Sequence, residues 1–306
     1  MSSSAQVERA LQQFLAQHPP KAGSLIITLF GDVISQHGNN VWLGSIIDSL
    51  SHFGLNARQI RTAISRLVQE DWLQSIQRGR RSYYSFTPGG KRRFERVAHR
   101  IYAAGFPRWD EQWTLVMLSL MESPVREQFR RELTWQGFGQ VNHGVFVHPS
   151  ADEKVLAELI KDFDVAEAIL VLRATTADVT SNAAIESLTA KAWRLPELQP
   201  RFDQFCGLFS QLARMLDDTG GALNGRVSFL ARLLLIHEYR RLLLKTPVLP
   251  RDLLSGLLPA EQASELAAKL YECVEQSSLE YILQSFESIN GPLPPVDDGF
   301  YRRFIH

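Results

Sequence analysis

Apolar residues in the first 70 positions recur every three or four residues, which is the spacing of amphipathic helices. A Pro-Pro pair, Gly38 and Gly54 interrupt this pattern, and residues of these types commonly end helices. Asn56 followed by Gln59 predicts a capping box at the start of the last helix. The pattern thus predicts four helices, with apolar stripes at residues 7–15, 25–34, 43–50 and 60–68.

After residue 71 the period shortens to that of strands. Residues 72–77 and 82–86 are short runs rich in aromatic and branched side chains, and they flank the sequence Arg-Gly-Arg-Arg at 78–81. This arrangement predicts a β-hairpin with glycine in its turn. A basic helix is expected at 91–101, and the turn residues at 104–110 indicate a linker.

The remaining two thirds of the chain fall into a mixed part and a helical part. The mixed part predicts strands at 113–120, 141–147 and 168–172 and helices at 125–136 and 154–163. This order is typical of a βαββαβ unit of the ferredoxin-like kind, with one strand not identified. Beyond it, without evident strands, helices are predicted at 183–193, 199–216, 227–244, 259–276 and 280–289, followed by an extended tail.

The predicted fold class is therefore α+β and multidomain. We expect a winged helix-turn-helix domain at 1–103, a ferredoxin-like unit at 111–182, and an all-helical C-terminal domain at 183–306. The helix-turn-helix comprises the third and fourth helices, and the hairpin after them is the wing.

Charge is distributed unevenly although the 33 basic and 33 acidic residues cancel. Residues 1–110 hold 14 Lys and Arg against 7 Asp and Glu, a net charge of +7, so the rest of the chain carries −7. Between Arg58 and Arg100 there are eleven basic and three acidic residues. Such a segment favours a polyanionic partner, and with a helix-turn-helix that partner is expected to be double-stranded operator DNA.

The predicted fourth helix has the side chains that DNA reading requires. Its outer stripe holds Arg58, Arg61, Thr62 and Ser65, and a major groove offers acceptors that match arginine and hydroxyl donors. Other side chains are expected to hold the phosphate backbone: Arg66, Arg78, Arg80, Arg81 and Tyr83. A solvated helix face, or a winged helix used for protein contacts, remains the alternative.

The chain also resembles a known family, the PaaX-like regulators that repress phenylacetate degradation. The resemblance is carried by residues 23–32, 41–45, 61–67, 72–73, 78–87, 237–241, 249–250 and 257–259. It implies a central ferredoxin-like domain that forms a homodimer, repression of aromatic-acid catabolic genes, and release by phenylacetyl-coenzyme A. One departure follows residue 259, where Ala-Glu-Gln-Ala replaces the acidic residue, Trp and Gly typical of the family, so a different acyl-CoA effector is open.

Several polar residues of the predicted helix at 227–244 and its start are candidates for binding the effector. They are Arg226, Arg232, His237, Arg240 and Arg241. For the cluster at 237–241 a buried polar network, a phosphate site for coenzyme A, and catalysis are all open. The zinc helix of metalloproteases is excluded because position 241 is Arg and not a second His.

No catalytic or cofactor motif is evident, so we expect no enzyme, no metal and no cofactor other than the effector ligand. The central unit resembles small CRISPR-associated nucleases, but its first strand runs into Leu-Ser-Leu-Met-Glu at 118–122 without their aspartate, which favours a dimerisation platform. The two cysteines, and the lack of a signal peptide or membrane-spanning run, predict a soluble cytoplasmic protein. An acyl-CoA enzyme with an appended winged helix, and a winged-helix protein scaffold, are the rival hypotheses.

Overall fold

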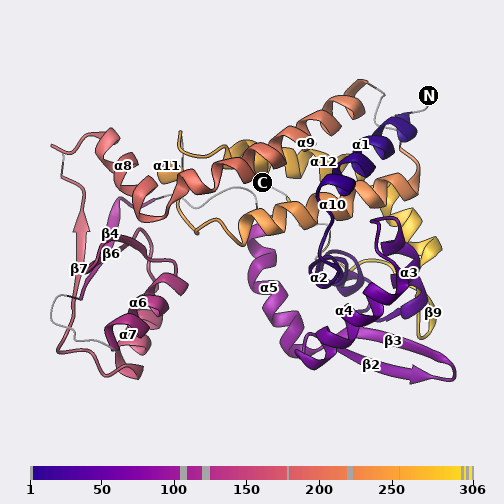
Figure 1. Cartoon of the computed structure of the whole chain (residues 1–306), viewed down its shortest axis with the longest axis horizontal. Helices are drawn as coiled ribbons and strands as arrows, with labels where there is room; N and C mark the ends of the chain where they lie inside the picture. Colours follow the sequence, from indigo (N-terminus) through magenta and orange to yellow (C-terminus); the bar gives the residue numbers. More distant parts are fainter. Residues whose placement is uncertain are drawn as a thin grey trace. The chain divides into compact units, whose positions relative to one another are not determined.

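The computed structural model describes residues 3–103, 109–118, 125–177, 179–218, 223–254, 256–297, 300 and 303–304. The chain forms two compact units (Figure 1). The first comprises Met1–Ala104, Gln204–Leu244 and Gln262–His306, and the second comprises Gly105–Asp203 and Lys245–Glu261. The division into three domains at 103, 111 and 183 stays a prediction, and the expected linker lies mostly outside the described residues.

The four helices expected at the start of the first unit are present. They are α1 (Ser3–Gln17), α2 (Ala22–Asp32), α3 (Leu43–Ser51) and α4 (Ala57–Gln69), with a short 3-10 helix, η1 (Ile34–Gln36), after α2. The apolar stripes are buried, as Leu25, Ile46 and Ile60 show with no exposed surface. Gly54 has a φ of +77°, so it supplies the left-handed residue that lets the chain turn between α3 and α4.

The basic hairpin is also present, and it belongs to a three-stranded antiparallel sheet. β2 (Leu73–Arg78) and β3 (Arg81–Phe86) pair, and β1 (Val41–Trp42) adds to the other side of β3. β1 was not expected, because two residues are too short to show an alternating pattern. The helix after the hairpin, α5 (Pro88–Tyr102), begins where the Thr87 hydroxyl accepts a hydrogen bond from the amide of Gly90.

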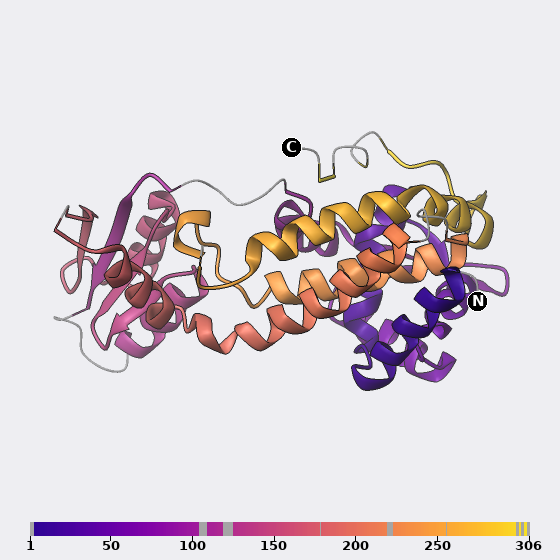
Figure 2. The ribbon, with the colours of Figure 1, turned by 90° about the horizontal axis from the view of Figure 1, so that it is seen from above.

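The C-terminal helices of the first unit correct one sequence prediction. α10 (Gly225–Leu243) is buried on most of its circumference, and α12 (Ala260–Ser285) runs alongside it (Figure 2). The helices expected at 259–276 and 280–289 are wrong: they form one helix, because the apolar spacing continues through Leu279 and Ile282 and Ser278 is buried in it. α9 (Gln199–Asp218) agrees with its prediction to within two residues.

The chain after α12 was expected to be strand-free, and this expectation is wrong. A hairpin follows, made of β8 (Glu287–Ser288) and β9 (Gly291–Pro292). The Asn290-Gly291 pair is a hairpin turn signal, and Gly291 has a φ of +107°. The signal was missed because the strands it joins have only two residues each.

The second unit contains the expected βαββαβ order, including the fourth strand that the sequence analysis did not identify. Its strands are β4 (Gln112–Met117), β5 (Gly139–Asn142), β6 (Val145–His148) and β7 (Leu170–Thr175), and its helices are α6 (Val125–Trp135) and α7 (Glu153–Asp162). The single strand expected at 141–147 is wrong, because a turn at His143-Gly144 divides it into β5 and β6. The sheet order is β5-β6-β4-β7, and the part of β4 predicted beyond residue 118 lies outside the described residues.

Each face of this sheet has its own apolar cluster. On one face Val116 and Phe146 pack with Phe129 and Leu133 of α6 and with Leu156 of α7. On the other, Trp113 and Val147 pack with side chains of α8 (Asn182–Ala192) and of the short helix α11 (Arg251–Leu254). The sheet is therefore covered by helices on both faces near β4 and β6.

A buried carboxylate ties the N-terminal helices of the first unit to its C-terminal part. Asp32, at the end of α2, accepts hydrogen bonds from Arg232 Nε of α10 at 2.8 Å and from the Tyr271 hydroxyl of α12 at 3.2 Å. The carboxylate of Asp32 also accepts hydrogen bonds from the Tyr102 hydroxyl at 2.7 Å and from Arg303 at 2.8 Å. Burial opposes ionisation, but the two arginines and these hydrogen bonds hold the pKa of Asp32 below its usual value.

Replacing this carboxylate should therefore destabilise the first unit strongly. We expect Asp32→Asn to lower the free energy of unfolding by about 3–5 kcal/mol, because two buried guanidinium groups lose their counter-charge. Urea unfolding followed by circular dichroism measures the loss. The control is Asp71→Asn, which removes a carboxylate that is 76% exposed and should cost under about 0.5 kcal/mol. A loss of less than about 1 kcal/mol for Asp32→Asn would contradict the role given to this carboxylate.

Candidate nucleic-acid interface

Helix α4 presents a basic and hydroxyl-bearing stripe to solvent. Its start is fixed by the predicted capping box, in which the Asn56 side chain accepts from the Gln59 amide and Gln59 Oε1 accepts from the Asn56 amide, both at 2.9 Å. Ile60, Ile64 and Leu67 are buried on the inner side. The candidates on the outer side are all exposed: Arg58, Arg61, Thr62, Ser65 and Arg66.

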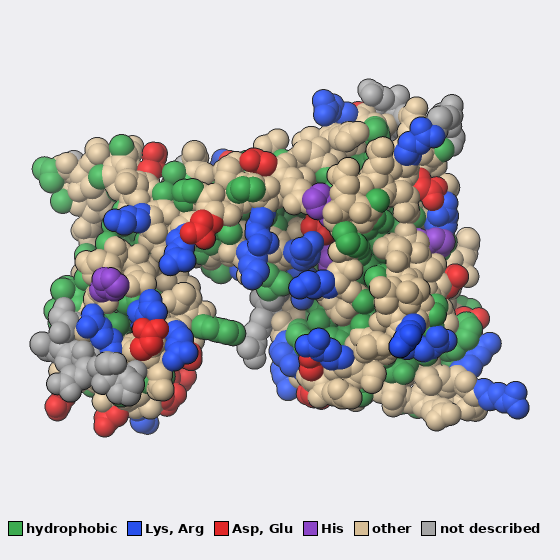
Figure 3. Space-filling model, viewed as in Figure 1, with side chains coloured by type: hydrophobic (Ala, Val, Ile, Leu, Met, Phe, Trp, Pro, Cys, Tyr) green, Lys and Arg blue, Asp and Glu red, His purple; other side chains and the backbone are tan. Residues whose placement is uncertain are grey.

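The hairpin places further arginines on the same unit, near α4 (Figures 1 and 3). Arg78 and Arg81 pair across the turn, and the two residues between them are Gly79, with a φ of +61°, and Arg80. Arg80 is exposed. The surface thus combines a helix with short and forked donors and a basic hairpin tip, the two features that groove reading and phosphate binding need.

Two of the hairpin arginines contact the C-terminal hairpin of the same unit. Arg81 lies 2.5 Å from the carboxylate of Glu287 and stacks over Trp42, 4.4 Å from its ring centre. Arg78 donates to the carbonyl of Ile289 at 2.9 Å. No local sequence pattern predicts these contacts, because more than 200 residues separate the partners.

Tyr83, which is expected to hold the DNA backbone, is largely buried in the sheet of the hairpin. Its side chain is only 6% exposed, because alternation along β3 turns it inward. Its hydroxyl shares a hydrogen bond with Arg81, and this bond together with Glu287 raises the pKa of Arg81 above its usual value. Tyr83 therefore contacts Arg81, and its expected contact with the DNA backbone stays a prediction.

Three of the five candidates for effector binding are paired with carboxylates. Arg226 lies 2.7 Å from Glu8, and Arg241 lies 2.8 Å from Glu238. Arg232 is fully buried and paired with Asp32 at 2.8 Å. A ligand phosphate at any of these positions would have to compete with the existing partner.

The other two candidates are buried: His237 Nε2 lies 3.9 Å from a carboxylate oxygen of Glu238, whereas Arg240 forms no ion pair with a described carboxylate. His237 Nδ1 lies 3.1 Å from the Thr28 hydroxyl of α2, and burial lowers the pKa of His237 to about 3, so the ring is neutral. Arg240 is 7% exposed, and its single recorded hydrogen bond, from NH1, reaches the Ser24 hydroxyl at 3.4 Å. The five candidates thus do not converge on one described pocket, and their role in effector binding stays a prediction.

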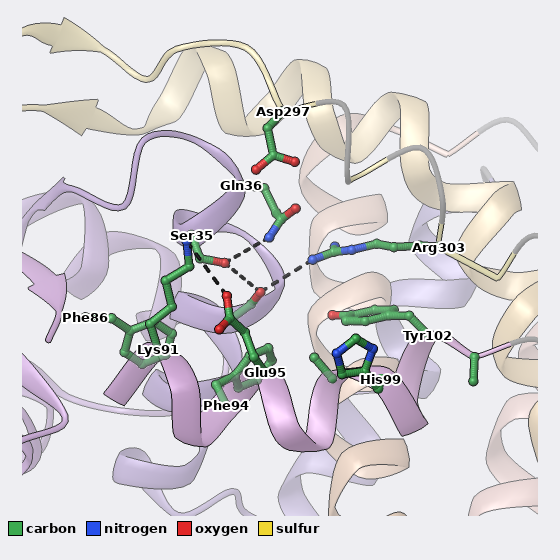
Figure 4. A pocket seen from close by; sticks show the side chains of 13 residues that line it. Ser35, Gln36, Phe86, Lys91, Phe94, Glu95, His99, Tyr102, Asp297 and Arg303 are labelled. Atoms are coloured by element: carbon green, nitrogen blue, oxygen red, sulfur yellow. Dashed lines mark hydrogen bonds and ion pairs between the residues drawn. The ribbon is translucent and has the colours of Figure 1, made fainter. Parts of the chain in front are cut away.

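A pocket of about 580 Å³ lies between α2, α5 and the C-terminal segment (Figure 4). The rings of Phe86 and Phe94 form part of its wall, and Lys91 pairs with Glu95 at 3.8 Å on the same side. Arg303 enters the pocket from the opposite side, but its guanidinium is already hydrogen-bonded to the Asp32 carboxylate. The volume suits a small ligand, but these charges are already compensated within the protein.

Within the described residues, no group of three His, Cys, Asp or Glu side chains is placed to hold a metal ion. None of the described helices is long and apolar enough to cross a membrane.

Comparison with protein-family models places the chain in a family of regulators whose domains cover most of its length. Residues 21–90 match the model of the PaaX-like protein, residues 107–186 match the PaaX protein central Cas2-like domain, and residues 193–284 match the PaaX-like protein C-terminal domain. The chain therefore belongs to the PaaX family.

A curated relative and a solved structure refine this placement. The chain is 31% identical over 300 residues to the transcriptional repressor PaaX of Escherichia coli strain K12, covering 98% of this chain and 95% of the relative. It is also similar in fold to the uncharacterized protein Rv0674 of Mycobacterium tuberculosis. That match has a TM-score of 0.53 and 18% identity and covers 85% of this chain and 99% of the other.

The neutral, buried His237 makes stability sensitive to acid. In the unfolded chain a histidine has a pKa near 6.5, whereas in the fold the pKa of His237 is about 3, so protons bind the unfolded state first. Its contribution is present above pH 6.5 and is lost as the pH falls toward 3. We expect His237→Gln to reduce the loss of unfolding free energy between pH 7 and pH 5 by up to about 2 kcal/mol.

Urea unfolding at both pH values measures this difference. The exposed His99 provides a matched control, and His99→Gln should leave the acid sensitivity as in the original protein. An equal acid sensitivity in His237→Gln and the original protein would refute the assignment.

Proposed function

We propose that this protein is a DNA-binding transcriptional repressor of phenylacetate catabolic genes. The observation that carries the proposal is the exposed stripe of α4, with Arg58, Arg61, Thr62 and Ser65, on the same unit as the basic hairpin tip at Arg80. The Escherichia coli relative is a transcriptional repressor, which agrees with this surface.

In this proposal the first unit carries a winged helix-turn-helix. The turn at Gly54 joins α3 to α4, and the sheet order β1-β3-β2 provides the wing after the second of these helices. Helix α4 enters the major groove, where Arg61 reads a base edge, and Arg80 binds a phosphate. Arg78 and Arg81 belong to the base of the wing, since the C-terminal hairpin engages both.

We further propose that the second unit is ferredoxin-like and joins two copies of the chain. The order β5-β6-β4-β7 with βαββαβ connectivity supports the fold name. β7 is an edge strand whose Leu170, Val171 and Leu172 are 52%, 39% and 40% exposed. An apolar free edge favours a partner, and a second copy suits it because an edge can pair with its own symmetry mate. The dimer presents two α4 helices to a palindromic operator.

Release of DNA is proposed to follow binding of phenylacetyl-coenzyme A or a related acyl-CoA. A ligand shifts the equilibrium only if it binds the DNA-free form more tightly than the DNA-bound form. The links from α10 to α2 through Asp32 and His237 offer a route by which a change at the C-terminal helices reaches the DNA-reading unit. The effector residues themselves stay predictions.

Substitutions in α4 and the wing should have different consequences. We expect Arg61→Ala to cost about 1–3 kcal/mol on the operator and little on random DNA, because it removes a base contact. Arg80→Ala should weaken operator and random DNA alike, because it removes a phosphate contact. Fluorescence anisotropy on the DNA upstream of the protein's own gene measures both. Equal losses on both kinds of DNA for both variants would contradict this division of roles.

The same titration tests the function with phenylacetyl-coenzyme A added and free phenylacetate as the control. Loss of binding with the thioester alone supports repressor and effector together, and binding indifferent to both compounds rejects this effector. Absence of salt-sensitive DNA binding would overturn the DNA function in favour of a protein scaffold. Turnover of the thioester would favour an acyl-CoA enzyme.

The edge strand of the second unit is tested by the oligomeric state. We expect Leu172→Glu to shift the protein from dimer to monomer in sedimentation analysis, because a charge is placed on a face that the second copy covers. Glu167→Gln, at an exposed position before the strand, is the control and should leave the dimer intact. A dimer of unchanged stability in Leu172→Glu would exclude β7 from the interface.

A further inference from the structure

A second groove of the first unit lies between the start of α2 and the outer side of α4. It has a volume of about 830 Å³, and Ile27, Leu55 and Ala63 form part of its floor. Its lining includes three of the α4 candidates for DNA contact, namely Arg58, Thr62 and Arg66. The first turn of α2, residues 21–24, lines the same groove, although sequence reasoning gave this segment no role.

The first turn of α2 has amide groups available for an anion. Lys21 is the N-cap residue and makes no side-chain capping bond, and the first intrahelical bond runs from the Leu25 amide to the Lys21 carbonyl at 3.0 Å. The amides of Ala22, Gly23 and Ser24 precede that bond, so they have no partner within the helix. A side chain added at Gly23 would meet no atom within 4 Å, which shows that the space beside this turn is open.

A buried cation behind this turn is a second, independent feature that favours an anion there. Arg240 of α10 is 7% exposed, and its NH1 points to the Ser24 hydroxyl in the first turn of α2. Among the described residues, its Nε has no hydrogen-bond partner and no carboxylate forms an ion pair with its guanidinium. Desolvation lowers the pKa of Arg240 to about 10, the expected response of a buried charge that lacks compensation.

Two positive features therefore line the groove, the amide end of α2 and the exposed Lys21, and the buried guanidinium of Arg240 adds positive charge behind them through its contact with Ser24. Helix N-termini stabilise anions through their amides and their dipole, and phosphate is a common occupant. We propose that this turn binds a phosphate group of the DNA backbone that flanks the major groove read by α4. DNA is the favoured source of the phosphate because Arg58 and Thr62 share the groove.

This inference rests on the proposed DNA-binding function and adds a contact that fixes the position of α4 on the duplex. A backbone contact of this kind carries no sequence information, so it strengthens operator and random DNA equally. A phosphate at this turn also explains the sequence Lys-Ala-Gly-Ser at the start of α2. Its small side chains leave the space beside the turn open, and no side chain caps the helix.

Two variants test the contact without disturbing the core. Lys21→Gln removes the exposed charge. Ala22→Pro removes one amide hydrogen at the first helical position, where proline is tolerated, and Lys21 already has the extended conformation that a following proline requires (φ −71°, ψ 122°). We expect each variant to weaken binding to operator and random DNA by about 3–10-fold at about 0.1 M salt, and Lys21→Gln to reduce the slope of log K against log salt by about 1.

The matched control is Lys161→Gln, an exposed lysine of α7 in the second unit, which should leave both affinity and slope unchanged. Unchanged affinity and slope in Lys21→Gln and Ala22→Pro, while Arg61→Ala still loses operator binding, would overturn this inference and leave the DNA function standing. If the unmodified protein binds no DNA, both fall together. If the two variants bind DNA normally but resist release by phenylacetyl-coenzyme A, the phosphate belongs to the effector and the assignment to DNA is wrong.

Discussion

The first unit depends on one buried carboxylate shared between two arginines. Asp32 has no exposed surface, and neither has Arg232, while the side chain of Arg303 is 7% exposed. Removing such charges from water costs several kcal/mol for each ion, so the cluster is stable only because its hydrogen-bonding groups are nearly all matched. Tyr102 and Tyr271 contribute hydroxyl donors and ring faces, and Arg303 lies 4.1 Å from the centre of the Tyr102 ring.

This cluster decides how the chain is divided. It brings together α2, α5, α10, α12 and the C-terminal segment, so the N-terminal helices and the C-terminal helices belong to one compact unit. The C-terminal hairpin extends the same connection to the basic hairpin through Glu287 and Arg81. In the proposed function, a change in α10 or α12 can therefore act on α4 and the basic hairpin within one unit, whereas a separate C-terminal domain would need a second interface to act on DNA binding.

Local signals in the sequence predicted α4 and the basic hairpin well. The capping box at Asn56 and Gln59, the left-handed Gly54 and the glycine in the hairpin turn each act within four residues, so the sequence alone reveals them. β1 and the C-terminal hairpin were missed because each strand has two residues, and pairing with distant segments stabilises them. The partner of Arg232 was equally hidden, because Asp32 lies 200 residues away and no local pattern connects the two.

Distance in sequence also explains why the sequence alone does not distinguish the five arginine and histidine candidates on α10 as binding residues. In the fold these candidates differ in their partners. Glu8, Asp32 and Glu238 neutralise the charges of three arginines. His237 is a neutral ring beside the Thr28 hydroxyl. Arg240 alone keeps a charge that no described carboxylate balances, and its guanidinium points to the amide end of α2, where the helix dipole adds further positive potential. Uncompensated positive charge at the first turn of α2 destabilises the fold unless an external anion balances it. A site that gains stability from an anion supplied by its target couples the folded unit directly to that target.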